Sequence, residues 1–142
     1  MVNEYVAAGE AARLQKAVIE RLIAHAPSAA KCVFLNCEMV DSPSGMAMSD
    51  DLFAVIKPLL GKAKKVRLDM DATTFTLLTA LGRQIMNGDR KHLILDLLID
   101  PRGNCRAFCD DGELKRLEGG SRSFKTKHKF YAEIEPWLAQ VE

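Results

Sequence analysis

Residues 92–109, with the sequence HLILDLLIDPRGNCRAFC, decide the fold because they predict a β-hairpin. The run Leu93 to Ile99 is the most apolar in the chain, and it stops at Asp100-Pro101-Arg102-Gly103. This tetrapeptide has turn chemistry: aspartate bonds its own backbone two residues on, proline presets φ, and glycine accepts a positive φ. Beyond the turn the residues alternate, with Cys105, Ala107 and Cys109 on one face and Arg106 and Phe108 on the other. We therefore expect the hairpin to form the core of a sheet, where its residues serve packing rather than catalysis.

The composition is that of an ordinary globular domain. The chain has 142 residues, of which 48% are hydrophobic and 27% are charged, and its net charge is +1. This length predicts a single domain over residues 1–142 with a sizeable core. The near-zero net charge does not favour nucleic acid, and no apolar run reaches the roughly 18 residues of a membrane helix. Because Glu4 and Glu10 lie where a signal peptide would be apolar, we expect a cytoplasmic protein that does not bind membranes.

The four cysteines allow two interpretations. A zinc site would use Cys32, Cys37, Cys105 and Cys109, but neither pair is separated by the turn that a zinc knuckle contains. Both pairs lie in strand-like patterns, where cysteine behaves as a small hydrophobic residue. Cys32 and Cys37 also differ by an odd number of positions and so face opposite sides of a strand. We expect reduced core cysteines, and neither a metal nor another cofactor.

The chain before the hairpin alternates between helical and strand patterns. An amphipathic helix is predicted over residues 3–26. A strand over residues 31–40, with one mixed and partly solvated face, leads to a short strand at 46–48. A short helix over residues 52–60 and an edge strand over 66–70 are expected next.

A second amphipathic helix is predicted over residues 72–87, with Asp71 as its N-cap. Gly82 lies on its apolar stripe, where the missing side chain permits close packing on the sheet. The other members of this stripe are Phe75, Leu78, Leu81 and Ile85. A final helix, capped by Ser123 or Thr126, is expected to close the chain. This order of elements favours an α+β fold, with a mainly antiparallel sheet of four to five strands and helices packed on one face.

No sequence motif points to catalysis. The three histidines lie at a helix end, at a strand start and in a basic run, without a Cys or Ser that completes a catalytic pair. The sequence Gly119-Gly120-Ser121-Arg122 lacks the Lys-Ser/Thr of a phosphate-binding loop. Aromatic residues interleave the basic stretch 122–129, as in nucleic-acid-binding segments, but the low net charge favours a solvated helix start.

Acidic residues in and after the hairpin are the candidates for function. Asp96 lies in mid-strand within an apolar run, so it requires solvent or a partner, and we expect its face of the strand to be only partly covered. Asp100 belongs to the turn, whereas Asp110, Asp111 and Glu113 follow the hairpin. A metal-dependent nuclease or phosphatase that uses the strand-end acids is the enzymatic alternative.

The order of elements resembles that of the YezG-like and related bacterial toxin-immunity proteins. The similarity begins with an N-terminal helix that ends at a proline, Leu14 to Pro27, and a strand pair, Cys32 to Met48. A helix then leads into an apolar strand–Asp-x-x-Gly–strand hairpin, Leu93 to Asp111, and a terminal segment carries an aromatic anchor, Phe130 to Trp137. The chain lacks the family's aromatic-rich second strand and its more acidic composition, and residues 62–70 have no clear counterpart. The resemblance implies a non-enzymatic cytosolic protein that binds and blocks a partner toxin, often a nuclease, through an acidic exposed surface.

Our first hypothesis is therefore an immunity protein that neutralises a toxin by protein–protein binding. Asp110, Asp111 and Glu113, together with Asp96 or Asp100, would face a basic partner. The second hypothesis is a secretion chaperone-like dimer that binds an effector segment in an apolar groove. The third is a small ligand-binding or metal-dependent enzyme, whose melting temperature metal ions would raise. The sequence leaves the identity of the partner and the oligomeric state open.

Overall fold

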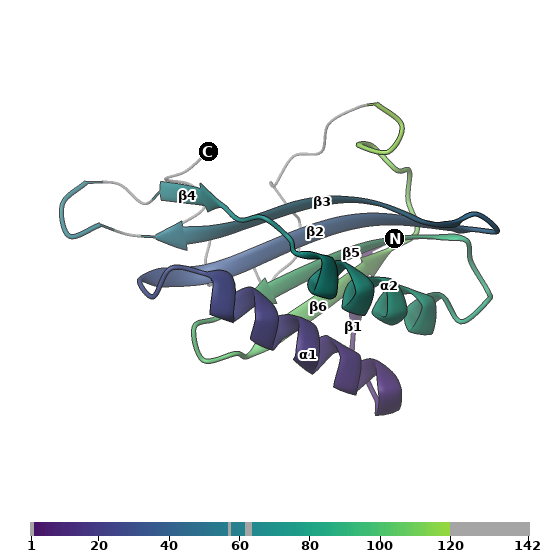
Figure 1. Ribbon diagram of the computed structural model, residues 1–142, viewed down its shortest axis with the longest axis horizontal. Coiled ribbons are helices and arrows are strands. Elements are labelled where there is room, and N and C mark those ends of the chain that lie inside the picture. The colour runs from purple at the N-terminus through teal and green to yellow at the C-terminus, as the bar shows by residue number, and fades with distance from the viewer. Residues whose placement is uncertain (1, 57, 62–63, 120–142) are drawn as a thin grey trace.

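The computed structural model describes residues 2–56, 58–61 and 64–119. Its elements are, in chain order, β1 (Val2–Tyr5), α1 (Gly9–His25), β2 (Ala30–Ser42), β3 (Gly45–Ile56), β4 (Lys64–Arg67), α2 (Ala72–Met86), β5 (His92–Ile99) and β6 (Cys105–Asp110). The strands form one antiparallel sheet in the order β1-β6-β5-β2-β3-β4, and both helices lie on the same face of it (Figure 1). The fold is therefore α+β with a mainly antiparallel sheet, as expected, but the sheet has six strands instead of four to five.

Strand β1 was not expected, because the first residues of the chain were predicted to be helical. It pairs with β6, with Tyr5 opposite Ala107, and α1 begins only at Gly9. Gly9 has a φ of +58°, a conformation that glycine adopts readily, and so it separates the strand from the helix. A four-residue strand is too short to show a period, and its partner lies far along the sequence, so local patterns did not reveal it.

Strand β3 contains the short strand that was predicted at 46–48, and it continues to Ile56, where the start of a short helix over residues 52–60 was predicted. It forms a long hairpin with β2, in which Phe53 lies opposite Phe34. Residues 52–55 are buried on both faces of the sheet. The prediction was wrong because a continuous apolar run lacks the alternation of a half-buried strand and resembles a buried helix segment.

The face of the sheet beneath α1 and α2, here called the helix-covered face, is apolar. Side chains from alternate strand positions merge there with the buried sides of both helices; they include Leu14, Val18, Leu22, Leu35, Cys37, Met39, Leu52, Leu78, Leu81, Leu95 and Leu97. The expected close approach at Gly82 is confirmed, because a Cβ there would lie 2.6 Å from Met39 Sδ. Phe75, by contrast, was wrongly placed in the buried stripe, since its side chain is 40% exposed.

The β5–β6 hairpin is as predicted, and β5 lies in the sheet between β6 and β2. Asp100 Oδ1 accepts hydrogen bonds from the backbone N–H groups of Arg102 and Asn104, both at 2.9 Å. Gly103 has a φ of +89°, as the turn requires. Cys105, Ala107 and Cys109 join the helix-covered face together, which confirms the expected alternation.

Helix α2 begins after Asp71, whose Oδ1 accepts a hydrogen bond of 2.7 Å from the Thr74 N–H. Arg21 of α1 also donates to Asp71, at 2.5 Å, and so connects the two helices. The hydrogen bond from Arg21, followed by those from Thr74, lowers the pKa of Asp71 below its usual value. Within the described residues, no helix is both long and apolar enough to cross a membrane. The predicted final helix, from residue 123 or 126 onward, lies outside the described residues.

Candidate functional site

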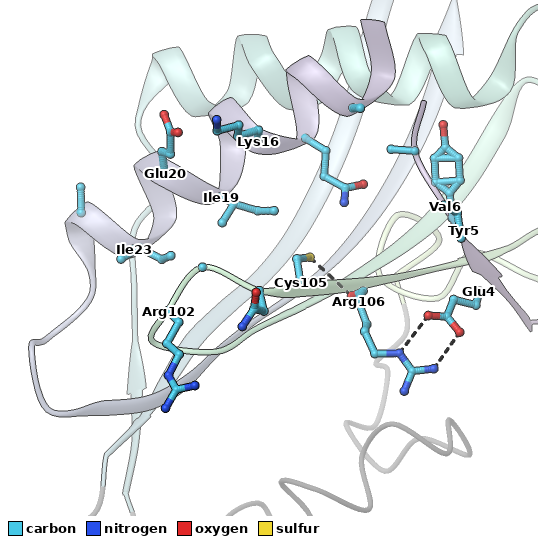
Figure 2. A pocket seen from close by; sticks show the side chains of 16 residues that line it. Glu4, Tyr5, Val6, Lys16, Ile19, Glu20, Ile23, Arg102, Cys105 and Arg106 are labelled. Carbon is cyan, nitrogen blue, oxygen red and sulfur yellow. Dashed lines mark hydrogen bonds and ion pairs between the residues drawn. The ribbon is translucent and has the colours of Figure 1, made fainter. Parts of the chain in front are cut away.

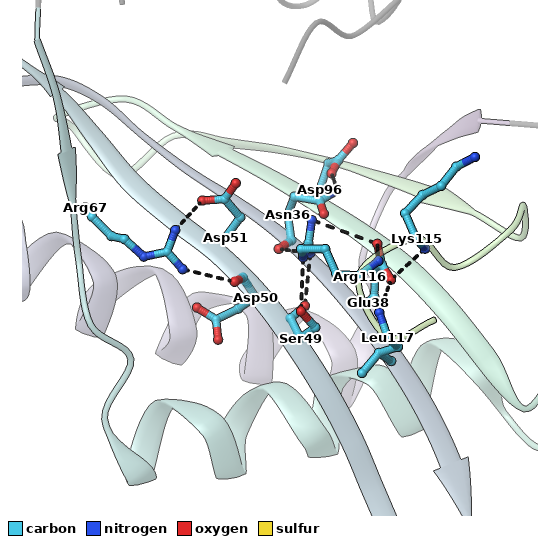
Figure 3. Close-up of polar contacts among 10 residues, drawn as sticks. All are labelled: Asn36, Glu38, Ser49, Asp50, Asp51, Arg67, Asp96, Lys115, Arg116 and Leu117. Atoms are coloured by element: carbon cyan, nitrogen blue, oxygen red, sulfur yellow. Dashed lines mark hydrogen bonds and ion pairs between the residues drawn. The ribbon is translucent and has the colours of Figure 1, made fainter. Parts of the chain in front are cut away.

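The face of the sheet opposite the helices, here called the far face, contains a polar cluster among apolar neighbours. The apolar side chains that share this face are Cys32, Phe34, Phe53, Val55, Ile94, Leu98 and Phe108, all of them buried. The far-face cluster consists of Asn36, Glu38, Ser49, Asp51, Asp96 and Arg116, which come from β2, β3, β5 and the segment after β6 (Figure 3). We expected this face to be partly solvated, but Ile94 and Leu98 are buried and Asp96 is only 9% exposed.

Glu38 is the centre of the far-face cluster and is fully buried. Its Oε1 accepts hydrogen bonds from the backbone N–H groups of Lys115 at 2.9 Å and Leu117 at 3.2 Å. Its Oε2 accepts one from the backbone N–H of Arg116 at 3.1 Å. A single carboxylate in mid-strand therefore holds three consecutive residues of the segment after β6 against β2. Such charge-assisted bonds to backbone N–H groups are stronger than neutral ones.

Arg116 extends this attachment to β3. Its guanidinium donates to the Ser49 hydroxyl at 3.1 Å, and to the carbonyl oxygens of Asn36 and Ser49, both at 3.0 Å. Its Nη1 lies 3.9 Å from Glu38 Oε2, so the charge of the buried carboxylate is partly compensated. The contacts of Arg116 join β2, β3 and the segment after β6 in one network (Figure 3).

Asp96 obtains its partner from the neighbouring strand. Asn36 lies opposite Asp96 in the β2–β5 register, and its Nδ2 donates to Asp96 Oδ1. Asn36 Oδ1 is buried and accepts no hydrogen bond from the described residues. On β3, Asp51 accepts a hydrogen bond of 3.1 Å from Arg67 of β4. Among the described residues, these bonds link members of the far-face cluster to one another and to the backbone, which favours a structural role.

The predicted partner-binding residues fall into three places. Asp96 is buried in the far-face cluster, and Asp100 is bonded within the hairpin turn, at the opposite end of β5 from Asp110. Asp110, Asp111 and Glu113 lie together where β6 ends, and we call this group the acidic end. Asp111 and Glu113 are exposed, Lys115 lies 3.9 Å from Glu113, and Asp111 and Arg90 line a small hollow of about 240 Å³.

A larger groove lies on the other side of the sheet, between α1 and the edge formed by β1 and β6. It has a volume of about 780 Å³, and the apolar side chains of Ile19, Ile23 and Cys105 line it (Figure 2). Val6, at its rim, is 84% exposed. The charged residues around it are Glu4, Lys16, Glu20, Arg102 and Arg106.

The cysteines lack the environment of catalytic or metal-binding thiols. Burial raises the pKa of Cys32 and Cys109 to about 11 and that of Cys105 to about 12. Burial also raises the pKa of Cys37. These thiols are therefore protonated at neutral pH and are poor nucleophiles. In the described part of the chain, no three His, Cys, Asp or Glu side chains are grouped so that they could hold a metal ion.

Sequence reasoning found Asp96 but missed Glu38 and Arg116. Glu38 had a usable signal, because a carboxylate in the middle of a strand with apolar neighbours requires a partner in the same way as Asp96. Arg116 had none, because it follows the hairpin in a polar segment whose path over the sheet no local pattern predicts. No protein-family model, no curated protein and no solved structure matches this chain.

Proposed function

We propose that this chain is a non-enzymatic binding protein, and within that class an immunity protein that neutralises a partner toxin by protein–protein binding. The observation that supports this proposal is the acidic end. Three carboxylates gather within four residues there, and Asp111 and Glu113 are exposed to solvent. The acids of the far-face cluster, by contrast, are buried, and Asp100 belongs to the hairpin turn at the other end of β5.

The electrostatics of the acidic end suit a basic partner. Carboxylates on an exposed surface attract a cationic protein and raise its association rate, and salt weakens this effect. Arg90 and Lys115 offset part of the charge, so the attraction is local to the end of β6. Binding would then be held by apolar or aromatic contacts next to this charged region.

The test begins with a cognate partner, which the tagged chain would capture from cells of its source. The dissociation constant is then measured for the wild type and for the double variant Asp110→Lys/Asp111→Lys. We expect the variant to weaken binding by about tenfold or more, mainly through a slower association rate. The salt dependence of the association rate should decrease at the same time.

The matched control is Glu20→Lys/Asp69→Lys, which makes the same charge change at two exposed acids away from the end of β6. If the control weakens binding as much as the acidic-end variant, net charge rather than this surface governs recognition. If neither variant changes the affinity, the acidic end is not the binding surface. Metal ions that raise the melting temperature would instead favour the enzymatic alternative.

A further inference from the structure

The two edges of the sheet are protected to different degrees. At one edge, β4 carries Lys64, Lys65 and Arg67, charged residues of the kind that prevents strands from pairing between molecules. At the other edge, β1 has neither lysine nor proline, and no described strand pairs with its outer side. The single charge of β1, Glu4, is neutralised by Arg106, whose guanidinium donates to it at 2.9 and 2.7 Å.

The backbone at this second edge has groups that point outward. Asp100 N–H donates to the Asn104 carbonyl oxygen at 2.9 Å. In the antiparallel β5–β6 pair, even-numbered residues of β6 therefore direct their backbone groups toward β5. Odd-numbered residues then point the other way. Asn3 and Tyr5 lie opposite Cys109 and Ala107 and so direct their backbone groups toward β6, which leaves the N–H and C=O of Glu4 pointing outward from the sheet.

The groove beside this edge has an apolar floor and a matching protrusion. Ile19 and Ile23 of α1 line it together with Cys105, while Val6 protrudes at its rim (Figure 2). Gln15 Oε1 also belongs to the groove; it is buried and accepts no hydrogen bond from the described residues. The groove therefore has an uncovered apolar surface beside the exposed Val6.

We propose that a second copy of this chain docks at this edge, with the two β1 strands antiparallel about a two-fold axis and each Val6 covering the groove of the other copy. In a two-fold interface each copy presents the same surface, so that surface must contain both the groove and the side chain that fills the other copy's groove. The groove and the exposed Val6 meet this requirement. The pairing also satisfies the outward backbone groups of β1 and joins two sheets into one.

The charges of the rim suit this occupant better than a strongly charged partner. Lys16 and Arg102 carry positive charge, Glu20 carries negative charge, and Glu4 and Arg106 neutralise each other. A rim with both signs and a net charge near zero can complement its own copy, whereas the uniformly basic β4 edge would repel its copy. The proposal does not depend on the toxin-binding function.

The experiment measures the mass of the full chain by light scattering and sedimentation equilibrium, from about 1 to about 200 µM. We expect a dimer of twice the 15.7 kDa chain mass, which dissociates on dilution. Val6→Lys should raise the dimer dissociation constant by about tenfold or more, because it places a charge in an apolar groove. Leu60→Lys, at an 87% exposed position near β4, is the matched control and should leave the dimer unchanged.

Hydrogen exchange gives a second readout that does not depend on a variant. The amide of Glu4 should exchange more slowly at high protein concentration than at low concentration, because it points outward from β1 and is covered only in the dimer. An equal melting temperature for Val6→Lys and wild-type monomers shows that the variant folds. A monomer at the highest concentration, or a dimer that Val6→Lys does not weaken, overturns the proposal. An extended segment of another protein is then the remaining occupant to test.

Discussion

The two faces of the sheet are closed in different ways, although the same strands supply both. On β2, Leu35 and Cys37 point to the helix-covered face, and Asn36 and Glu38 point to the far face. The helix-covered face is closed by two amphipathic helices and depends on apolar burial. The far face is held around its centre by a buried carboxylate and an arginine that attach the segment after β6. Side chains are buried on both faces, but on the far face they include a charge, which is tolerated only while its bonds are intact.

Removal of the central carboxylate is the largest expected effect. Glu38→Ala leaves three backbone N–H groups without their acceptor and the guanidinium of Arg116 without its ion-pair partner. We expect the free energy of unfolding to fall by about 3–5 kcal/mol, as measured by urea denaturation. Glu113→Ala, which removes an exposed carboxylate, is the control and should change it little. A Glu38→Ala protein as stable as wild type would mean that the network does not stabilise the far face.

A cavity on the helix-covered face should have a slightly smaller cost. Leu35→Ala removes a fully buried side chain beneath the helices, and we expect a loss of about 2–5 kcal/mol in the free energy of unfolding. This substitution should destabilise the whole domain without selectively freeing residues 115–117. If Leu35→Ala increases hydrogen exchange in residues 115–117 more than elsewhere in the chain, the attachment of that segment depends on the helix-covered face, contrary to expectation.

Asn36, a neutral member of the far-face cluster, should matter less. Asn36→Ala removes the donor to Asp96 and leaves that buried carboxylate without this bond. We expect the free energy of unfolding to fall by about 1–3 kcal/mol. The double variant Asn36→Ala/Asp96→Ala should recover part of this loss, because it removes both partners. Additive losses in the double-mutant cycle would show that the two side chains are not coupled.

The smallest effect concerns the rim of the helix-covered face and depends on pH. Asp71→Asn keeps a capping oxygen for α2 but loses the ion pair with Arg21. Because the pKa of Asp71 is lowered in the folded state, its contribution is complete well above the usual value of 3.8 and is lost as the pH falls through and below it. The stability difference between wild type and variant should therefore be constant near neutral pH and shrink in acid. A difference that grows in acid would contradict the assigned ion pair.

The sequence predicted the helix-covered face better than the far face, and particular residues show why. The spacing of Leu78 and Leu81, the stop at Asp100 to Gly103 and the small residue at position 82 are local signals, and each was confirmed. β1 and the second half of β3 were missed because distant pairing, rather than local periodicity, determines them. The sequence indicated that Asp96 requires solvent or a partner, but its hydrogen-bond donor, Asn36, lies 60 positions away.

The candidate site was predictable only in part for the same reason. The acids at the end of β6 follow directly from the hairpin, so their grouping could be read from the chain order. The attachment of Arg116 to Ser49 spans 67 positions and follows a segment without periodic structure. Residues that close a face from a distant loop leave no pattern of their own in the sequence.

We propose that Glu38 attaches the segment after β6 to the far face in a structural role, and that the acidic end beside it binds the partner. Hydrogen exchange at the amides of Lys115, Arg116 and Leu117 tests this claim most directly, in the wild type and in Glu38→Gln. We predict that all three amides are protected in the wild type, and that the neutral variant loses this protection while the amides of α1 and α2 keep theirs. Rapid exchange of these amides in the wild type, or unchanged protection in Glu38→Gln, would contradict the account.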